Sequence, residues 1–146
     1  MSTTNCRCDC KAWIIQSLIV ALVFFGVDFV VQHKILMPDW MAMIDRWRPI
    51  PEMESKRWVA FGMYLLFGFL FTAIFAKGYE PDKPRQVQGI RFGAVMGLFY
   101  WGCQLLGMYP FEPWPNVLYF KVFAFGMGEF LLLGVLVGAM YRPKTT

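Results

Sequence analysis

The fold is decided by the stretch ALVFFGVD (residues 21–28), which places an acidic side chain, Asp28, near the end of a long apolar segment. A similar stretch, GLFYWGCQ (residues 97–104), lies inside another apolar segment and ends in Gln104. In both stretches, the polar side chain follows the same order of residue types: a small residue, a leucine, bulky and aromatic residues, and a glycine. A polar group in such a segment is costly unless protein or water faces it. Both stretches therefore predict helices whose polar side chains point into the interior of a membrane protein.

The composition of the chain also indicates an integral membrane protein. Of the 146 residues, 58% are hydrophobic and only 16% are charged, against roughly 25% charged residues in soluble domains. The mean hydropathy is +0.46. The net charge of +4 is small and its charges are spread along the chain, which argues against a nucleic-acid partner. We expect a single domain, residues 1–146, with the lipid bilayer as its surroundings.

Four apolar segments are long enough to cross a bilayer as helices, which takes about 20 residues each. They cover residues 12–33, 58–77, 89–109 and 116–141, and prolines and charged residues separate them. The predicted fold class is an all-α, four-transmembrane-helix bundle. With the N-terminus inside, eight Lys and Arg face the cytoplasm and six face the other side. This bias favours both termini in the cytoplasm.

The segment between the first two spans predicts a short helix of its own. Apolar residues recur there at helical spacing after Asp39, and Pro49 and Pro51 are expected to end the helix. These residues are Trp40, Met43, Ile44 and Trp47. Asp39 is expected to be its N-cap. Tryptophan favours the membrane interface, so we expect this helix to lie in the headgroup region, with a soluble loop helix as the alternative. Lys121 is expected to extend toward the same interface.

Further short matches suggest an internal repeat. FGM occurs at residues 61–63 and 125–127, and a Tyr-x-Pro motif follows the second span at residues 79–81 and the fourth at residues 141–143. Together with the first pair of stretches, these matches keep their order along the chain. They predict two repeated helix hairpins related by an axis along the membrane normal. Chance similarity between apolar sequences is the alternative.

Glycines at four-residue intervals predict a close helix contact. They are Gly89, Gly93 and Gly97 in the third span and Gly134 and Gly138 in the fourth. Small residues at this spacing flatten one face of a helix, so that the backbone of a neighbour can approach it. The neighbour is expected either within the bundle or in a partner chain.

The polar residues inside the spans are the candidate functional residues. Asp28 and Glu129 are the acids within the spans, and at 1.5 Å per residue they lie about 24 Å and about 18 Å from the inner ends of their helices. They are therefore expected to meet across the bundle, with Gln104 at the depth of Asp28. One interpretation is a proton or cation relay through this intramembrane polar layer. The alternative is a clamp between helices, or a bond from Asp28 to Gln32 one turn on.

The polar N-terminal tail carries a possible metal site. Cys6, Cys8 and Cys10 alternate with other residues, and thiolates select soft metals such as copper or zinc. The tail is short and contains no Cys-x-x-Cys motif, so we expect no cofactor as the first interpretation. His33, the single histidine, follows the first span and is expected to be an interfacial residue. No pairing of a nucleophile with a base is visible in the sequence, so we expect no enzyme.

Three short motifs resemble a family of small four-helix bacterial membrane proteins of unknown function. They are Val27-Asp28-Phe29, Trp47-Arg48-Pro49 and Gly89-Ile90-Arg91-Phe92-Gly93. The resemblance implies a helical bundle in a bacterial inner membrane, and it implies no activity. The cysteine tail has no counterpart in it.

The sequence predicts a non-enzymatic, multi-pass membrane protein. The leading interpretation is an accessory subunit that packs into a homo-oligomer or a larger membrane complex, because the chain is small and carries a glycine stripe. The second is a proton- or cation-coupled transporter of small solutes that uses Asp28 and Glu129. The third is binding or transport of a soft metal through the cysteine tail.

Overall fold

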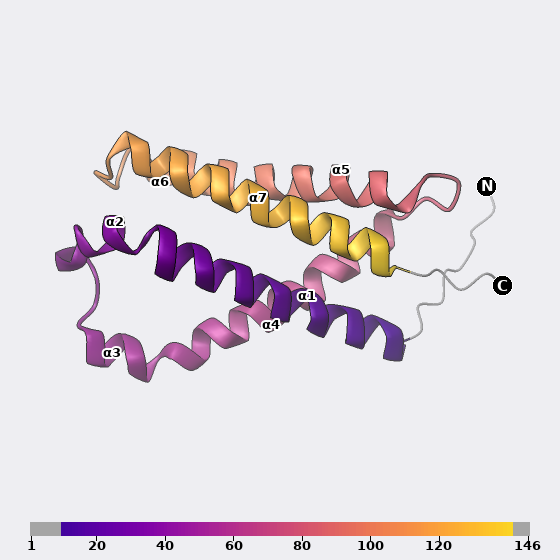
Figure 1. Ribbon diagram of the computed structural model, residues 1–146, viewed down its shortest axis with the longest axis horizontal. Coiled ribbons are helices and arrows are strands. Elements are labelled where there is room, and N and C mark those ends of the chain that lie inside the picture. Colours follow the sequence, from indigo (N-terminus) through magenta and orange to yellow (C-terminus); the bar gives the residue numbers. More distant parts are fainter. Residues whose placement is uncertain (1–9, 142–146) are drawn as a thin grey trace.

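The computed structural model describes residues 10–141, and within that range the chain is all-helical, as predicted. Its long helices are α1 (Cys10–Val30), α4 (Arg57–Gly78), α5 (Arg85–Gly97) and α7 (Asn116–Met140). Shorter pieces connect or extend them: the π-turn η1 (Val31–Ile35), α2 (Met37–Met41), the 3-10 turn η2 (Ile44–Arg46), α3 (Ile50–Ser55), the π-turn η3 (Leu98–Gly102) and α6 (Cys103–Met108). The start of α1 and the end of α7 lie at the end of the molecule opposite α2 and α3 (Figure 1).

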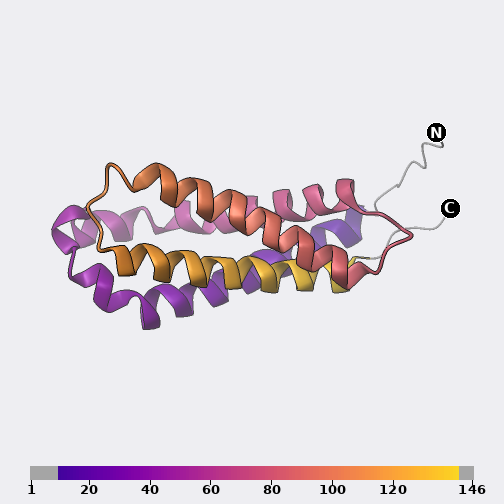
Figure 2. The same ribbon diagram turned by 90° about the horizontal axis from the view of Figure 1, so that it is seen from above.

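Among the described residues, three helical runs are long and apolar enough to cross a membrane. They are Cys10–Ile35, Arg57–Gly78 and Asn116–Met140, and they coincide with three of the four predicted spans. The remaining prediction, residues 89–109, falls on α5, η3 and α6, which continue one another along one side of α7 (Figure 2). That run contains Arg91 and Gln104 and is less apolar than the other three.

The most extensive helix contact joins α5 to α7 through the glycines. A side chain at Gly89 would overlap the carbonyl oxygen of Gly134, and one at Gly93 would overlap that of Phe130. Gly97 lies against the side chain of Phe130, and Gly138 lies against the backbone of Arg85 and Gly89. The two backbones therefore touch at Gly89, Gly93, Gly134 and Gly138, which only residues without a side chain allow, while Gly97 makes room for the Phe130 side chain. All five predicted packing glycines take part in this contact inside the chain.

The contact between α1 and α4 is built differently. A single glycine, Gly68, faces the backbone of Ser17 and the side chain of Ala21. Beside it, the buried hydroxyls of Ser17 and Thr72 are 2.6 Å apart and form a hydrogen bond between the helices. The two hairpins α1–α4 and α5–α7 thus pack through different residues, and the internal repeat remains a prediction.

The apolar core forms two clusters along the helices. One joins α1, α4 and α7 around Phe24, Phe71 and Phe130, and the other joins η1, α6 and α7 around Leu36, Leu105 and Leu118. Large rings fill the first cluster, and the ring centroids of Phe67 and Phe130 are 5.3 Å apart. The first loop packs on the second cluster through Trp40. The polar residues described below lie along α1 and α7 between these apolar groups.

The loop between α1 and α4 corrects part of the prediction. In place of one amphipathic helix, residues 37–55 form α2, η2 and α3. Pro49 and Pro51 do not end a helix but begin α3, because proline is tolerated in the first helical turn, where its missing N–H is not needed. Asp39 is not an N-cap either; it lies in the first turn of α2 and accepts a charged hydrogen bond from Lys121 of α7 at 2.8 Å.

Candidate functional site

Asp28 lies on α1, three residues before the π-turn η1, and its exposed fraction is only 9%. Its carboxylate accepts two hydrogen bonds, one from the hydroxyl of Tyr64 in α4 and one from Nε2 of Gln32 at 3.1 Å. The other end of the Gln32 amide accepts a bond from the indole N–H of Trp40 at 2.8 Å. A hydrogen-bonded chain therefore runs from α4 through α1 to the first loop. It contains the bond to Gln32 and an interhelical bond, both features of the clamp interpretation.

Glu129 lies on α7 and has an exposed fraction of 3%. Neither of its carboxyl oxygens has a hydrogen-bond partner, and the buried indole N–H of Trp101 has none either. These three are the buried side-chain nitrogen and oxygen atoms without a partner within residues 10–141. A buried polar group without a partner costs about 1–3 kcal/mol. Such a group in a folded protein calls for a function or for a bound proton, ion or water.

The two acids belong to one interior region but do not touch. α1, which carries Asp28, packs on α7, which carries Glu129. No hydrogen bond joins the two carboxyls directly, and Tyr64 is the direct interhelical partner of Asp28. Trp101 packs its indole ring into the space left by Gly126, one turn before Glu129 on α7. The region around the two acids thus includes Tyr64 and Trp101, which the sequence did not identify as candidate functional residues.

Gln104 does not join this layer. Its side chain is exposed on α6, and the hydrogen bonds of the interior polar residues do not involve it. The reason is the position of the π-turns relative to the two similar stretches. In the first stretch the π-turn comes after Asp28, whereas in the second η3 comes before Gln104. A π-turn adds residues to the turn and rotates everything after it, so the equivalent sequence positions face different directions.

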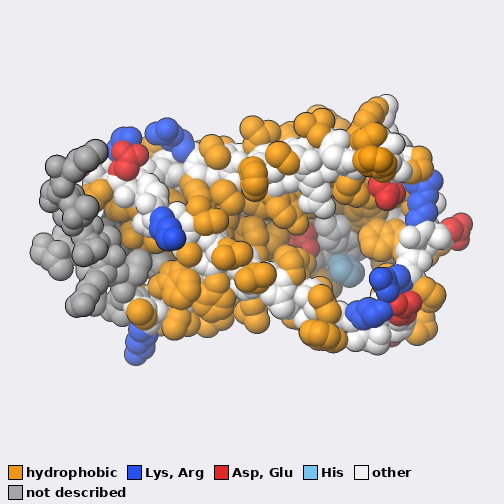
Figure 3. Space-filling view, turned by 180° about the vertical axis from the view of Figure 1, so that it is seen from behind, with side chains coloured by type: hydrophobic (Ala, Val, Ile, Leu, Met, Phe, Trp, Pro, Cys, Tyr) orange, Lys and Arg blue, Asp and Glu red, His pale blue; other side chains and the backbone are white. Residues whose placement is uncertain are grey.

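A cavity reaches Asp28 from the outside of the molecule. It has a volume of about 620 Å³ and lies between the end of α1, η1 and the first half of α4. Its lining residues are Phe25, Asp28, Phe29, Gln32, His33, Arg57, Ala60, Phe61 and Tyr64. Figure 3 shows a hollow at this end of the molecule, with acidic and histidine side chains inside it and hydrophobic side chains around it.

A second groove continues this cavity toward the first loop. Its volume is about 510 Å³, and it shares Gln32, His33 and Arg57 with the cavity at Asp28. Its remaining lining comes mainly from apolar residues of the loop, namely Met37, Trp40, Met41, Ile44, Trp47, Ile50 and Met53, together with Glu54. The cavity at Asp28 and this largely apolar groove are therefore neighbours that share three lining residues.

Arg57 and His33 also line the cavity. Arg57 forms an ion pair with Glu54 at 3.6 Å, and both side chains are mostly exposed. The ring of His33 stacks on Phe29 with centroids 4.2 Å apart, and its Nδ1 lies 3.2 Å from the carbonyl oxygen of Phe29. His33 thus occupies the exposed position expected of an interfacial histidine.

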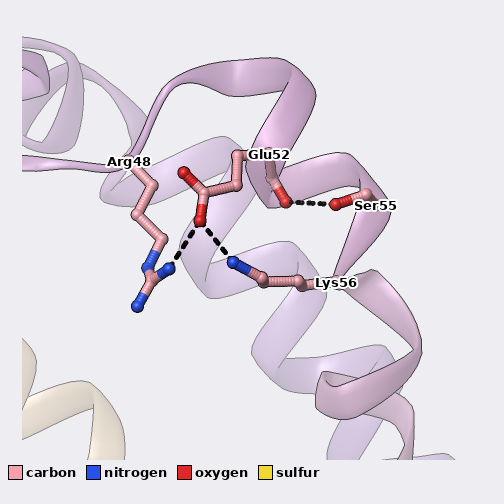
Figure 4. Close-up of polar contacts among 4 residues, drawn as sticks. All are labelled: Arg48, Glu52, Ser55 and Lys56. Carbon is pink, nitrogen blue, oxygen red and sulfur yellow. Dashed lines mark hydrogen bonds and ion pairs between the residues drawn. The ribbon is translucent and has the colours of Figure 1, made fainter.

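An exposed charge cluster holds the start of α3. Figure 4 shows Glu52 between Arg48, which is 2.6 Å away, and Lys56, while the hydroxyl of Ser55 donates to the Glu52 carbonyl at 2.8 Å. The hydrogen bond from the Lys56 ammonium and that from the Arg48 guanidinium hold the pKa of Glu52 below its ordinary value. Exposed ion pairs of this kind stabilise a fold only slightly, so the cluster orients the loop and is not part of the core.

The predicted metal site lies mostly outside the described residues, because Cys6 and Cys8 precede residue 10. Cys10 is the first residue of α1 and is exposed, as is Cys103 on α6. Between residues 10 and 141, no group of three or more His, Cys, Asp or Glu side chains is arranged to hold a metal ion.

Sequence reasoning missed several of the residues that organise this region. Tyr64 could have been found from depth, because it lies about as far from the start of its predicted span as Asp28 lies from the end of the preceding one. Gln88 gave no such signal; its side chain bonds the backbone of Glu80 and Lys83 and fixes the turn between α4 and α5. Comparison of the chain with protein-family models, curated proteins and solved structures finds no match. The site is therefore interpreted from its geometry.

Proposed function

We propose that this protein is a non-enzymatic, proton- or cation-coupled transporter of small solutes, with Asp28 as the binding group and Glu129 as a second, interior acid. The observation that carries the proposal is the cavity of about 620 Å³ that reaches the buried carboxyl of Asp28. An acid inside an apolar span is a candidate functional group by default. Here it also lines a space that a solute can enter, which a purely structural clamp does not require.

Four membrane spans are part of this proposal. Three helical runs have the length and hydropathy of a span, and α5, η3 and α6 supply the fourth by continuing without a break beside α7. The distribution of Lys and Arg favours cytoplasmic termini. The resemblance of three short motifs to small bacterial membrane proteins favours the bacterial inner membrane.

The geometry suggests a different role for each of the two acids. Tyr64 and Gln32 orient the Asp28 carboxylate, which has further acceptor sites for a proton or a cation from the cavity. Glu129 is buried on α7, does not line the cavity and has no hydrogen-bond partner. Because α1 packs on α7, we propose that a positive charge bound at one acid compensates the negative charge at the other. Occupation of Asp28 would then be coupled to the proton on Glu129.

The proposal is tested by proton movement in liposomes that contain the purified protein and a trapped pH-sensitive dye. An imposed pH gradient should collapse faster than in empty liposomes when a monovalent cation that has no neutral form, such as tetraethylammonium, is added outside. Asp28→Asn should abolish this response, because the amide cannot carry the charge. Glu129→Gln should reduce it, since the second acid is lost.

Glu112→Gln is the matched control, because this acid lies in the connection before α7 rather than in the polar layer. It should behave as the unmodified protein does. A response that is the same in Asp28→Asn and in the unmodified protein would reject transport through this site.

An accessory subunit is the second candidate, and one surface of α7 favours it. The glycine stripe that suggested a partner packs on α7 inside the chain. On another face of α7, however, Ala124 and Gly128 are exposed one turn apart, and the space beside Gly128 is open. Small residues at this spacing suit a close contact with a helix of a second copy. No contact among the described residues favours binding of copper or zinc.

A further inference from the structure

The cavity at Asp28 combines one carboxylate with aromatic walls. The ring of Phe25 lies 5.3 Å from that of Phe61 and 5.3 Å from that of Tyr64, measured between centroids. All three rings line the cavity together with Asp28. Aromatic faces attract cations electrostatically, and the attraction is strongest where water is excluded. The aromatic walls and the carboxylate of Asp28 thus both favour a positively charged ligand.

The charges along the cavity differ between its two ends. Arg57 lies at the outer end and is paired with Glu54 at 3.6 Å. Tyr64, which bonds Asp28, follows seven residues later on α4, about 10 Å deeper along the helix axis. His33 stacks on Phe29 at the outer end as well. Among the residues that line the cavity, Asp28 is the acid, so a positive group bound at the inner end would meet its carboxylate, with Arg57 about two helical turns away along α4.

We infer that the cavity between α1 and α4 binds hydrophobic organic cations, in which an ammonium or phosphonium centre carries apolar substituents. The cationic centre is held at Asp28, and the substituents lie against Phe25, Phe61 and Tyr64. This inference rests on the proposed transport function, because it names the class of solute that the same site accepts. The volume of about 620 Å³ lies within the range of roughly 300–1,000 Å³ of small-molecule sites.

Other ligand classes fit the cavity less well. A hard metal ion requires about six oxygen ligands, whereas the side-chain oxygens of the lining are those of Asp28, Gln32 and Tyr64, beside the cationic group of Arg57. An anion would meet the carboxylate of Asp28 at the inner end. A neutral apolar chain would leave the remaining acceptor sites of that carboxylate without a partner, at a cost in free energy. An apolar body with a positive centre satisfies both parts of the lining.

The test compares two probes of nearly the same size and shape but opposite charge. Binding of tetraphenylphosphonium and of tetraphenylborate to the purified full-length protein is measured by calorimetry in mild detergent. The phosphonium should bind at least tenfold more tightly than the borate. Asp28→Asn should weaken phosphonium binding at least tenfold and remove the preference. Equal affinity for the two probes in the unmodified protein would overturn the inference without use of any variant.

A second variant covers the case in which Asp28→Asn fails to fold. Phe61 is 47% exposed and lines the cavity, so Phe61→Leu should leave the fold intact and weaken phosphonium binding about threefold through loss of one ring face. Phe120→Leu is its matched control, because Phe120 is 72% exposed on α7 and outside the cavity. Equal effects of the two substitutions would also overturn the inference.

The inference and the proposed function fail in different ways. Phosphonium binding that depends on Asp28, without any proton movement in liposomes, would support the site and reject transport. Proton movement that depends on Asp28, without preference for the phosphonium, would support transport and reject the organic cation as its solute.

Discussion

Asp28 and Glu129 are both buried carboxyl side chains, yet their surroundings differ in kind. Asp28 has two hydrogen-bond donors from two helices and a cavity on one side. Glu129 has no partner at either oxygen. The first arrangement is compatible with a structural bond as well as with binding. The second stabilises nothing in the folded chain, so its presence is better explained by function than by stability.

This contrast predicts that removal of the Glu129 carboxyl stabilises the protein. Glu129→Met replaces an unpartnered polar group by an apolar one of similar length, and it should raise the free energy of unfolding by about 1–3 kcal/mol. Unfolding in mixed micelles with increasing dodecyl sulfate, followed by circular dichroism, measures the change.

Glu112→Met serves as the comparison at a half-buried position outside the helices. It should change the free energy of unfolding by much less. A clear loss of stability in Glu129→Met would mean that the carboxyl has a partner in the folded protein, and the argument for a functional acid would then fail.

At the scale of single elements, the two π-turns and the broken first loop explain most departures from the prediction. Regular helical periodicity suggested the bond between Asp28 and Gln32 as one alternative, since residues four apart share a face, and the structure contains this bond. The same periodicity placed Gln104 wrongly, because η3 rotates the helix before that residue. In the loop, prolines such as Pro49 and Pro51 are compatible with either the end or the start of a helix. The sequence pattern predicted the end of a helix, whereas the structure places them at the start of α3.

The start of α3 predicts a measurable dependence on pH. Lys56 and Arg48 lower the pKa of Glu52 in the folded state, so the cluster contributes its small stabilisation above the ordinary value of 4.5 and loses it as the pH falls through the lowered pKa. Carbon NMR of the Glu52 carboxyl should give a midpoint below 4.5.

Lys56→Gln should move that midpoint upward, because it removes the largest contribution to the shift. Molar salt should have the same effect, since exposed ion pairs are screened. A midpoint that Lys56→Gln leaves unchanged would show that the ammonium does not bond Glu52 in solution.

At the scale of the whole molecule, the surroundings of the glycines show which helix faces pack inside the chain and which are open to a partner. Gly93 lies in the contact between α5 and α7, so a large residue there would disrupt the chain itself and would not report on a partner. Gly128 faces open space and does report on one. If the protein packs with a second copy through this face, Gly128→Leu should convert a dimer into a monomer in mild detergent.

Light scattering of the purified protein measures that change, and Gly107→Leu is its control, because the space beside Gly107 on α6 is also open. The control should keep the oligomeric state of the unmodified protein. A monomer in every case would remove the support that α7 gives to the subunit candidate.

Composition and apolar length were enough to predict an all-helical chain with membrane-length helices, because these properties depend on sums over many residues. The site was less accessible to sequence reasoning. The bond from Tyr64 to Asp28 and the position of Trp101 over Gly126 depend on how helices are rotated about their axes. That rotation is set by packing between helices and by π-turns, neither of which leaves a clear pattern in a single apolar sequence.

The single close glycine between α1 and α4 has a mechanical consequence. Gly68 and the Ser17–Thr72 bond hold the two helices together near the middle of α4, whereas Arg57 lies eleven residues earlier on α4, about 16 Å from this contact. A tilt of α4 about Gly68 would displace Arg57, at the entrance of the cavity, much more than Tyr64. The entrance would thus widen for a bulky ligand while Tyr64, which is closer to Gly68, keeps its hydrogen bond to Asp28.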